Sequence, residues 1–181
     1  MNPVAEQLDL LLKLVPNAKT IGTIYCSSEV NSQLQVELLK KAAAAKGITV
    51  KEATVSTVND IQQAARSLAG DVQAVYVPTD NVLASAIPTL ISVTEEAKLP
   101  VICAEGGMVR AGGLATLGVD YYKLGFQTGV MAADILSGKA KPADMAIQAQ
   151  KEFKPTINLK EAAKIRVKVP EDLLKGAEVI K

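Results

Sequence analysis

Residues 21–50 read IGTIYCSSEVNSQLQVELLKKAAAAKGITV, and this stretch shows how the first part of the chain is built. An apolar run ends at Cys26 and meets a cluster of small polar residues. A helical pattern then runs to Gly47, and a second apolar run follows. Glycine just after a helical pattern is typical of a helix C-terminus. The stretch therefore predicts a strand, a sharp turn, a helix and another strand.

The same alternation recurs along residues 1–120. Apolar runs begin near residues 21, 48, 72, 100 and 114, and helical patterns separate the first four of them. Such alternation favours a parallel sheet with helices on both faces, and the nearly continuous apolar runs suit a sheet buried on both faces. We therefore predict an α/β fold, a three-layer αβα sandwich of flavodoxin-like or Rossmann-like type with strand order 2-1-3-4-5. Pro88 lies inside the third helical pattern and predicts a kink or a late helix start.

The chain changes character after residue 120. Residues 120–138 form a helical pattern with small residues on one face, and an extended segment over 146–155 and a short helix over 158–164 follow. We find no further strand-helix repeat there. We therefore predict a ligand-binding α/β lobe over 1–120, and a C-terminal helix and tail over 121–181 that pack on something other than this lobe.

The composition excludes several classes of function. Twenty Lys and Arg residues nearly balance nineteen Asp and Glu residues with no long basic run, which argues against nucleic acid as a partner. The absence of histidine removes Ser-His-Asp and Cys-His catalytic pairs and most transition-metal sites. The turn after residue 26 lacks the glycine patterns of dinucleotide and phosphate-binding loops. We expect no catalysis, no cofactor and no metal. Cys26 and Cys103 end strands that are not neighbours in the predicted order, so we expect buried free thiols.

Polar residues collect at one edge of the predicted sheet. Ligands of open parallel sheets bind beyond the carboxyl ends of the strands. Those ends are rich in hydroxyl, amide, carboxylate or glycine groups, whereas the loops at the opposite edge are ordinary connections. The polar ends are 26–29, 54–56, 78–81, 105–107 and 118–120. This asymmetry predicts a binding site at the carboxyl edge.

Each of these residues also has a purely structural interpretation. Ser27 or Ser28 would cap the following helix, and Asp80 and Asp120 would cap theirs, because the first amides of a helix lack partners. The two glycines after Glu105 serve a tight turn as readily as a close approach of backbone to ligand. Capping and ligand binding can coexist, so both interpretations stay open.

Four segments carry a resemblance to a known family. They are residues 2–43 (NPVAEQ to KKAA), 74–86 (AVYVPTDNVLASA), 104–145 (AEGGMVRAGG to KPADM) and 157–164 (INLKEAAK). Together they resemble the substrate-binding proteins of ABC transporters, most closely the group associated with aromatic amino acids such as tryptophan and tyrosine. The resemblance covers nearly the whole chain in the same order and spacing.

The resemblance implies a type I periplasmic-binding-protein fold, in which two Rossmann-like lobes close around a ligand across a hinge. This chain then corresponds to the C-terminal lobe plus the tail that returns to a missing N-terminal lobe. The implied partners are an amino acid, an ABC permease and that lobe. The implied location is periplasmic or extracellular, with a lipoprotein anchor in the full-length protein. Residues 1–19 carry acids and no basic n-region, so we do not interpret them as a signal peptide.

The resemblance also implies a set of ligand-binding residues from successive loops. These are Ser27, Ser28, Asn31, Ser32, Thr79, Asp80, Asn81, Glu105 and Asp120. The hydroxyls and amides suit a carboxylate, and Asp80 or Asp120 suits an α-ammonium group through charge-assisted hydrogen bonds. We favour Asp80 for the ammonium.

Two other hypotheses stay open. In one, Asp80, Glu105 and Asp120 form the carboxylate cluster of a flavodoxin-like, magnesium-dependent enzyme or regulator. In the other, residues 121–181 are exchanged between two copies and give a homodimer.

Overall fold

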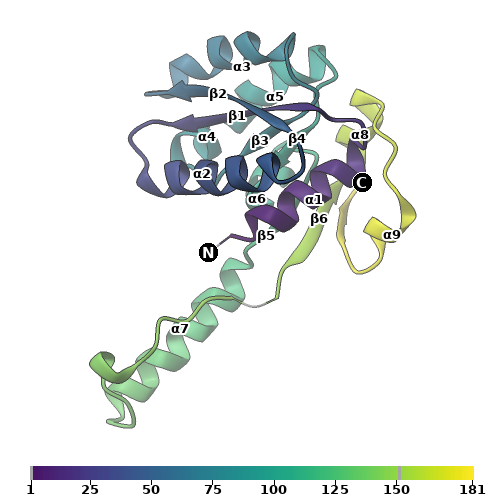
Figure 1. Ribbon diagram of the computed structural model, residues 1–181. Helices are drawn as coiled ribbons and strands as arrows, with labels where there is room; N and C mark the ends of the chain where they lie inside the picture. Colours follow the sequence, from purple (N-terminus) through teal and green to yellow (C-terminus); the bar gives the residue numbers. More distant parts are fainter. Residues whose placement is uncertain (1, 151) are drawn as a thin grey trace.

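The computed structural model describes residues 2–150 and 152–181 and contains one seven-stranded sheet, ordered β2-β1-β3-β4-β5-β6-β7 (Figure 1). Strands β1 to β5 run parallel, β6 is antiparallel to β5, and β7 is parallel to β6. The strands are β1 (Thr20–Cys26), β2 (Thr49–Val55), β3 (Val75–Val77), β4 (Val101–Cys103), β5 (Ala115–Gly118), β6 (Lys154–Asn158) and β7 (Glu178–Ile180). The predicted α/β sandwich and its order 2-1-3-4-5 are confirmed.

The helices follow the predicted alternation. They are α1 (Val4–Leu14), α2 (Val30–Ala44), α3 (Ile61–Ala69), α4 (Asn81–Ser85), α5 (Ile87–Glu96), α6 (Gly106–Arg110), α7 (Tyr121–Leu136), α8 (Leu159–Ile165) and α9 (Glu171–Leu174), with 3-10 turns η1 (Val58–Asp60) and η2 (Pro142–Asp144). The third predicted helix is broken at Ala86, and Pro88 lies in the first turn of α5. A proline is tolerated there because the first amides of a helix have no partner within the helix. Within the described residues, no helix has both the length and the apolar character that a membrane crossing needs.

The central strands β1, β3, β4 and β5 are buried on both faces of the sheet, and successive side chains of a strand point to opposite faces. Tyr76 and Ile102 face one apolar cluster with residues of α1 and α2. Val75, Val77 and Cys103 face a second cluster with residues of α3, α4, α5 and α6. The free thiols of Cys26 and Cys103 are both buried, as predicted.

A buried glutamine ties α1 to the carboxyl edge of the sheet. Gln7 is 0% exposed, and its amide nitrogen donates to the carbonyl oxygens of Ala104 (3.2 Å) and Leu117 (2.8 Å). Its amide oxygen accepts the Tyr76 hydroxyl at 2.7 Å. A buried polar group is costly unless it is hydrogen-bonded. This satisfied amide therefore fixes the start of α1 beside the carboxyl ends of β4 and β5.

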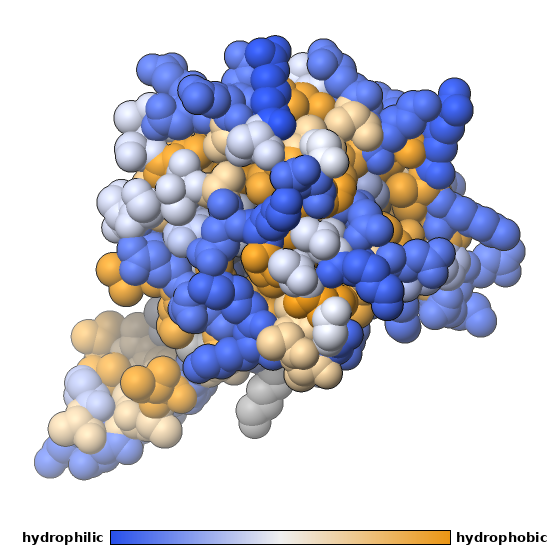
Figure 2. All heavy atoms as spheres, turned by 45° about the horizontal axis from the view of Figure 1, so that its top comes forward, coloured by the Kyte–Doolittle hydropathy of each residue, from blue (hydrophilic) through white to orange (hydrophobic). Residues whose placement is uncertain are grey.

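The last third of the chain divides into two parts. Residues 121–150, the arm, consist of α7 and a return segment, and they project away from the sheet (Figure 1). Every residue of α7 is at least partly exposed, and Figure 2 shows apolar side chains on the surface of the projection. Strands β6 and β7, by contrast, extend the sheet of residues 1–120. The sequence analysis did not predict these two short strands, and a separate packing partner remains a prediction for the arm alone.

A buried acid lies where α8 meets α5. Glu161 is 3% exposed and lies 3.7 Å from the ammonium of Lys164, which also pairs with Glu95 at 2.6 Å. Burial, reinforced by the nearby Glu95 carboxylate, raises the pKa of Glu161 to about 7. The folded state therefore binds this proton more tightly than the unfolded state does. The stability gained from it is present at low pH and is lost as the pH rises from the normal glutamate range toward 7.

We predict that Glu161→Gln stabilises the protein at pH 8 by about 1 kcal/mol, because it removes a buried charge that the ammonium of Lys164 offsets only in part. The gain should shrink as the pH falls and vanish near pH 4. Urea denaturation at several pH values measures it. Glu96→Gln, at an exposed acid on α5, is the control and should show no such dependence. If the free energy of unfolding of Glu161→Gln depends on pH in the same way as that of the wild type, the raised pKa of Glu161 is contradicted.

Candidate functional site

Two loops at the carboxyl edge of the sheet are held together by hydrogen bonds, which we call the lock. Asp80, after β3, is 3% exposed and accepts the backbone amides of Cys26 at 2.7 Å and Leu83 at 2.9 Å. Glu29, after β1, accepts the backbone amides of Asn81 at 2.9 Å and Val82 at 3.2 Å. Each loop thus supplies a carboxylate to the backbone of the other. Both oxygens of Asp80 are bonded, one to Cys26 at the end of β1 and one to Leu83 of its own helix α4.

The capping interpretation is correct for the acids and wrong for the serines. Asp80 caps α4, and Asp120 caps α7 by accepting the amides of residues 122 and 123 at 3.0 and 3.1 Å. The residue at the N-cap position of α2 is Glu29, not a serine. Ser27 and Ser28 are exposed, and the Ser28 hydroxyl lies 3.1 Å from the Cys26 sulfur. They fail to cap because α2 starts at Val30, one residue later than a cap by Ser28 requires and two later than a cap by Ser27 requires.

A polar wall joins α2 to the loop after β3. The Asn31 amide and the Ser32 hydroxyl donate to the carbonyl of Thr79 at 2.7 and 3.0 Å. Gln35 donates to the hydroxyl of Thr79 and accepts from its backbone amide. The Asn2 amide donates to Gln35 at 2.9 Å. The Asn31 amide and the Ser32 hydroxyl, which were predicted to bind a carboxylate, therefore already donate to the protein backbone.

A pocket of about 980 Å³ opens beside this wall. Five predicted site residues line it, namely Asn31, Thr79, Asp80, Asn81 and Glu105. Its apolar lining comes from α2, α4, α6, α7, the return segment of the arm and the residue before β6, and includes Leu34, Ala84, Met108, Leu124, Ile147 and Phe153. Most of its lining is therefore apolar, with polar groups on one side. Pockets for small molecules commonly have this character.

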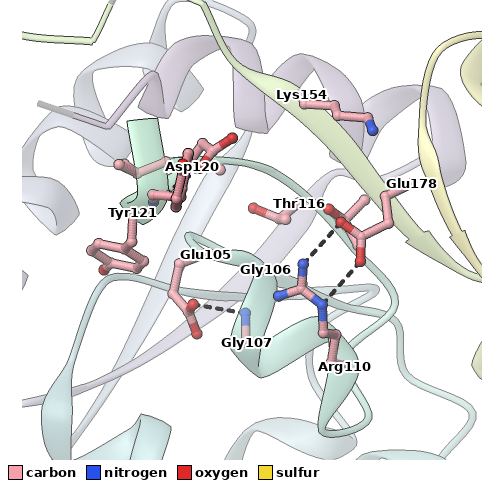
Figure 3. Close-up of a pocket in the computed structure, with 13 residues that line it drawn as sticks. Glu105, Gly106, Gly107, Arg110, Thr116, Asp120, Tyr121, Lys154 and Glu178 are labelled. Carbon is pink, nitrogen blue, oxygen red and sulfur yellow. Dashed lines mark hydrogen bonds and ion pairs between the residues drawn. The ribbon is translucent and has the colours of Figure 1, made fainter. Parts of the chain in front are cut away.

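A second pocket, of about 290 Å³, lies beyond β5 (Figure 3). Glu105 borders it and caps α6 through the amides of Gly107 (2.7 Å) and Met108 (2.6 Å). Arg110 pairs with Glu178 of β7 through two hydrogen bonds, at 2.9 and 2.8 Å. Asp120 is the other predicted residue in its lining, and Glu105, Val119 and Tyr121 line both pockets. The two pockets are neighbours on one edge.

The remaining predicted residues lie away from these pockets. Ser27, Ser28 and Ser32 are outside both linings. Sequence reasoning also missed several lining residues. Gln35 had a usable signal, since it lies one helical turn after Asn31 on the same face of α2. The pairing of Arg110 with Glu178, 68 residues apart, had none.

The thiol beneath the site is unreactive. Cys103 is 0% exposed, and burial, together with the Glu105 carboxylate, raises its pKa well above the ordinary range. A thiolate is the nucleophilic form of cysteine. Cys103 therefore acts as a small core residue.

The three carboxylates of the edge are not grouped around one point in the described part of the chain. Within residues 2–150 and 152–181, no group of three or more Cys, Asp or Glu side chains could hold a metal ion. Asp80, Glu105 and Asp120 are instead each directed to the start of a different helix. The carboxylate cluster of the magnesium hypothesis therefore does not form.

We predict that Asp80→Ala destabilises the fold by about 2–4 kcal/mol, because it leaves two buried amides without acceptors. Asp120→Ala, at a more exposed cap, should cost about 1 kcal/mol. Urea denaturation of both variants provides the comparison. Equal losses would show that the lock between the two loops contributes no more than a single helix cap.

Comparisons with known proteins point to substrate-binding proteins. The sequence profile of a family described as ABC transporter substrate binding protein matches residues 1–181. A tyrosine-binding protein of Clostridioides difficile is 42% identical over 137 residues, which are 76% of this chain and 40% of that protein.

Two solved structures superpose closely on the chain. A conserved domain protein of Vibrio cholerae has a TM-score of 0.93 at 36% identity, covering 100% of this chain and 61% of that one. An ABC domain of Streptococcus pneumonia in complex with L-Trp has a TM-score of 0.91 at 39% identity, covering 99% of this chain and 61% of that one. The chain thus spans less than two thirds of the length of these relatives.

Proposed function

The chain belongs to the family of ABC transporter substrate-binding proteins, and on this premise we propose that its carboxyl edge binds an amino acid, with an aromatic side chain, for an importer. The fold is that of type I periplasmic-binding proteins. The observation that carries the proposal is the pairing of a large, mostly apolar pocket with a small, charged one on the same edge.

The chemistry of the two pockets fits such a ligand. An aromatic side chain is a large apolar group with a rigid shape. Leu34, Met108 and Phe153 supply apolar contacts for it in the larger pocket. The ammonium and carboxylate groups of an amino acid need charged or hydrogen-bonding partners. The smaller pocket is lined by five charged residues. Named relatives bind tyrosine or L-Trp, which supports the aromatic class.

The arm supports a two-lobed full-length protein. Tyr122, Phe126 and Leu136 of α7 are 83%, 68% and 87% exposed, and Ile147 of the return segment is 100% exposed. Large apolar side chains gathered on one exposed segment mark an interaction surface. We infer that residues 121–150 pack on an N-terminal lobe, which the greater length of the relatives accommodates.

In this proposal, the two lobes close around the ligand, and the closed form carries out the function. Ligand held between two lobes favours the closed state, because contacts to both lobes exist only there. The closed form would dock on a permease and act by capture alone, without catalysis. Periplasmic or extracellular location and a lipoprotein anchor belong to the same proposal.

A second candidate is self-association, which the exposed apolar face of the arm favours. If two copies cover this face mutually, light scattering at high concentration should report a dimer. Phe126→Ser should return it to a monomer. A wild-type chain that stays monomeric at millimolar concentration excludes this candidate and leaves the lobe proposal intact.

We predict that the 181-residue chain alone binds L-tryptophan and L-tyrosine only weakly, in the millimolar range. One lobe covers about half of a ligand, whereas good sites bury roughly 70–90% of its surface. Amide chemical shifts in an NMR titration measure this, with L-alanine as the control lacking an aromatic ring. Low-micromolar affinity by calorimetry would contradict the single-lobe interpretation, and the absence of any shift at 10 mM would contradict the binding proposal.

A further inference from the structure

The smaller pocket contains a buried hydroxyl that nothing bonds. Thr116 is 0% exposed, and among the described residues no partner lies within hydrogen-bonding distance of its Oγ1 atom. Threonine hydroxyls both donate and accept, and a buried one left unbonded costs free energy. In Figure 3, Thr116 lies between the Glu105 and Asp120 side and the Arg110–Glu178 pair. The Thr116 hydroxyl in the wall of this pocket is therefore available to accept a hydrogen bond from a ligand.

The backbone next to this hydroxyl is kept clear. A Cβ atom on Gly118 would lie 3.1 Å from the Thr116 hydroxyl and 3.1 Å from the Cα atom of Glu105. The missing side chain leaves room between the hydroxyl and the Glu105 segment. Any larger residue at 118 would crowd both.

The charges around the pocket favour a cation over an anion. The Arg110 guanidinium is already engaged by both oxygens of Glu178. Asp120 uses only its Oδ1 atom in capping α7, so Oδ2 has capacity for another donor. Lys154 is exposed, and Figure 3 shows its ammonium on the side of Glu178, away from Glu105 and Asp120. The side of the pocket next to Thr116 therefore offers acceptors.

Asp80, which the sequence favoured for the ammonium of an amino acid, is occupied. Its oxygens hold the amides of Cys26 and Leu83, and it is 3% exposed. An ammonium there would have to compete with two short hydrogen bonds that hold the loops together. Asp120 has no such commitment at Oδ2.

We propose that the 290 Å³ pocket is the subsite for the α-ammonium group of the ligand, with the Thr116 hydroxyl and the Oδ2 atom of Asp120 as its acceptors. This rests on the proposed function. An ammonium has three donors, and these two acceptors take two of them. The Glu105 carboxylate, whose two oxygens already cap α6, adds a neighbouring negative charge. The shared border of Glu105, Val119 and Tyr121 lets the same ligand place its aromatic side chain in the larger pocket.

Ligand analogues test the charge assignment. In NMR titrations of the 181-residue chain, tryptamine retains the ammonium and lacks the carboxylate, and indole-3-propionate has the reverse. Tryptamine should shift the amides of Thr116 and Asp120 and bind within about 10-fold of L-tryptophan. Indole-3-propionate should bind at least 10-fold more weakly than tryptamine and leave those amides unmoved. The opposite order would overturn the ammonium assignment while preserving amino-acid binding.

A matched pair of variants tests the hydroxyl. Thr116→Val removes it at nearly constant shape and should weaken L-tryptophan and tryptamine about 10-fold, as expected for a hydrogen bond to a charged group. Thr23→Val is the control, because Thr23 on β1 is also 0% exposed and also lacks a partner among the described residues, yet lies outside both pockets. Its affinities should be unchanged. Equal affinities in both variants would overturn the role of Thr116.

Asp120→Asn provides a second variant should Thr116→Val fold poorly. Asparagine is as good an N-cap as aspartate, so α7 should be retained while the charge is lost. Tryptamine binding should fall about 10-fold, and indole-3-propionate binding should not fall. If L-tryptophan, tryptamine and indole-3-propionate all leave the wild-type spectrum unchanged, amino-acid binding itself fails. If L-tryptophan binds and Asp120→Asn has no effect, only the subsite assignment fails.

Discussion

The carboxyl edge depends on the exchange of carboxylates between the loops after β1 and β3. Asp80 holds the amides of Cys26 and Leu83, and Glu29 holds those of Asn81 and Val82. Because each loop satisfies backbone groups of the other, neither can move without exposing unbonded amides. The lock positions the polar wall of Asn31, Ser32 and Thr79 and turns the start of α4 toward the larger pocket. Rigid support of this kind lets a site on loops bind a small molecule.

The parallel part of the fold was predictable because its physics is local and repeated. Apolar runs buried on both faces and helices of crossover length leave few arrangements, and the order 2-1-3-4-5 follows from right-handed connections. Strands β6 and β7 escaped prediction because they lie outside the repeated alternation of strands and helices. β6 pairs antiparallel with β5 across more than 30 intervening residues, so no local sequence pattern predicts this pairing.

The sequence brought the candidate site residues to one edge of the sheet but did not predict their contacts. The polar asymmetry of strand ends predicted a site at the carboxyl edge, and Asn31, Thr79, Asp80, Asn81 and Glu105 line one pocket there. The role of each side chain depended on partners that the sequence does not reveal. Asp80 and Asp120 look alike in sequence, yet one is buried with both oxygens bonded and the other keeps an oxygen available. Burial decides between them, and burial is a property of the assembled structure.

The chain leaves the sheet toward the arm and returns from it at adjacent points, since Gly118 of β5 pairs with Lys154 of β6. A body carried by residues 121–150 is consequently attached by two strands bonded side by side. Two connections that lie side by side resist twisting about the direction in which they run. They bend most easily about the axis that passes through both of them. Relative motion of such a body would follow one swinging coordinate, so opening and closing become a single degree of freedom.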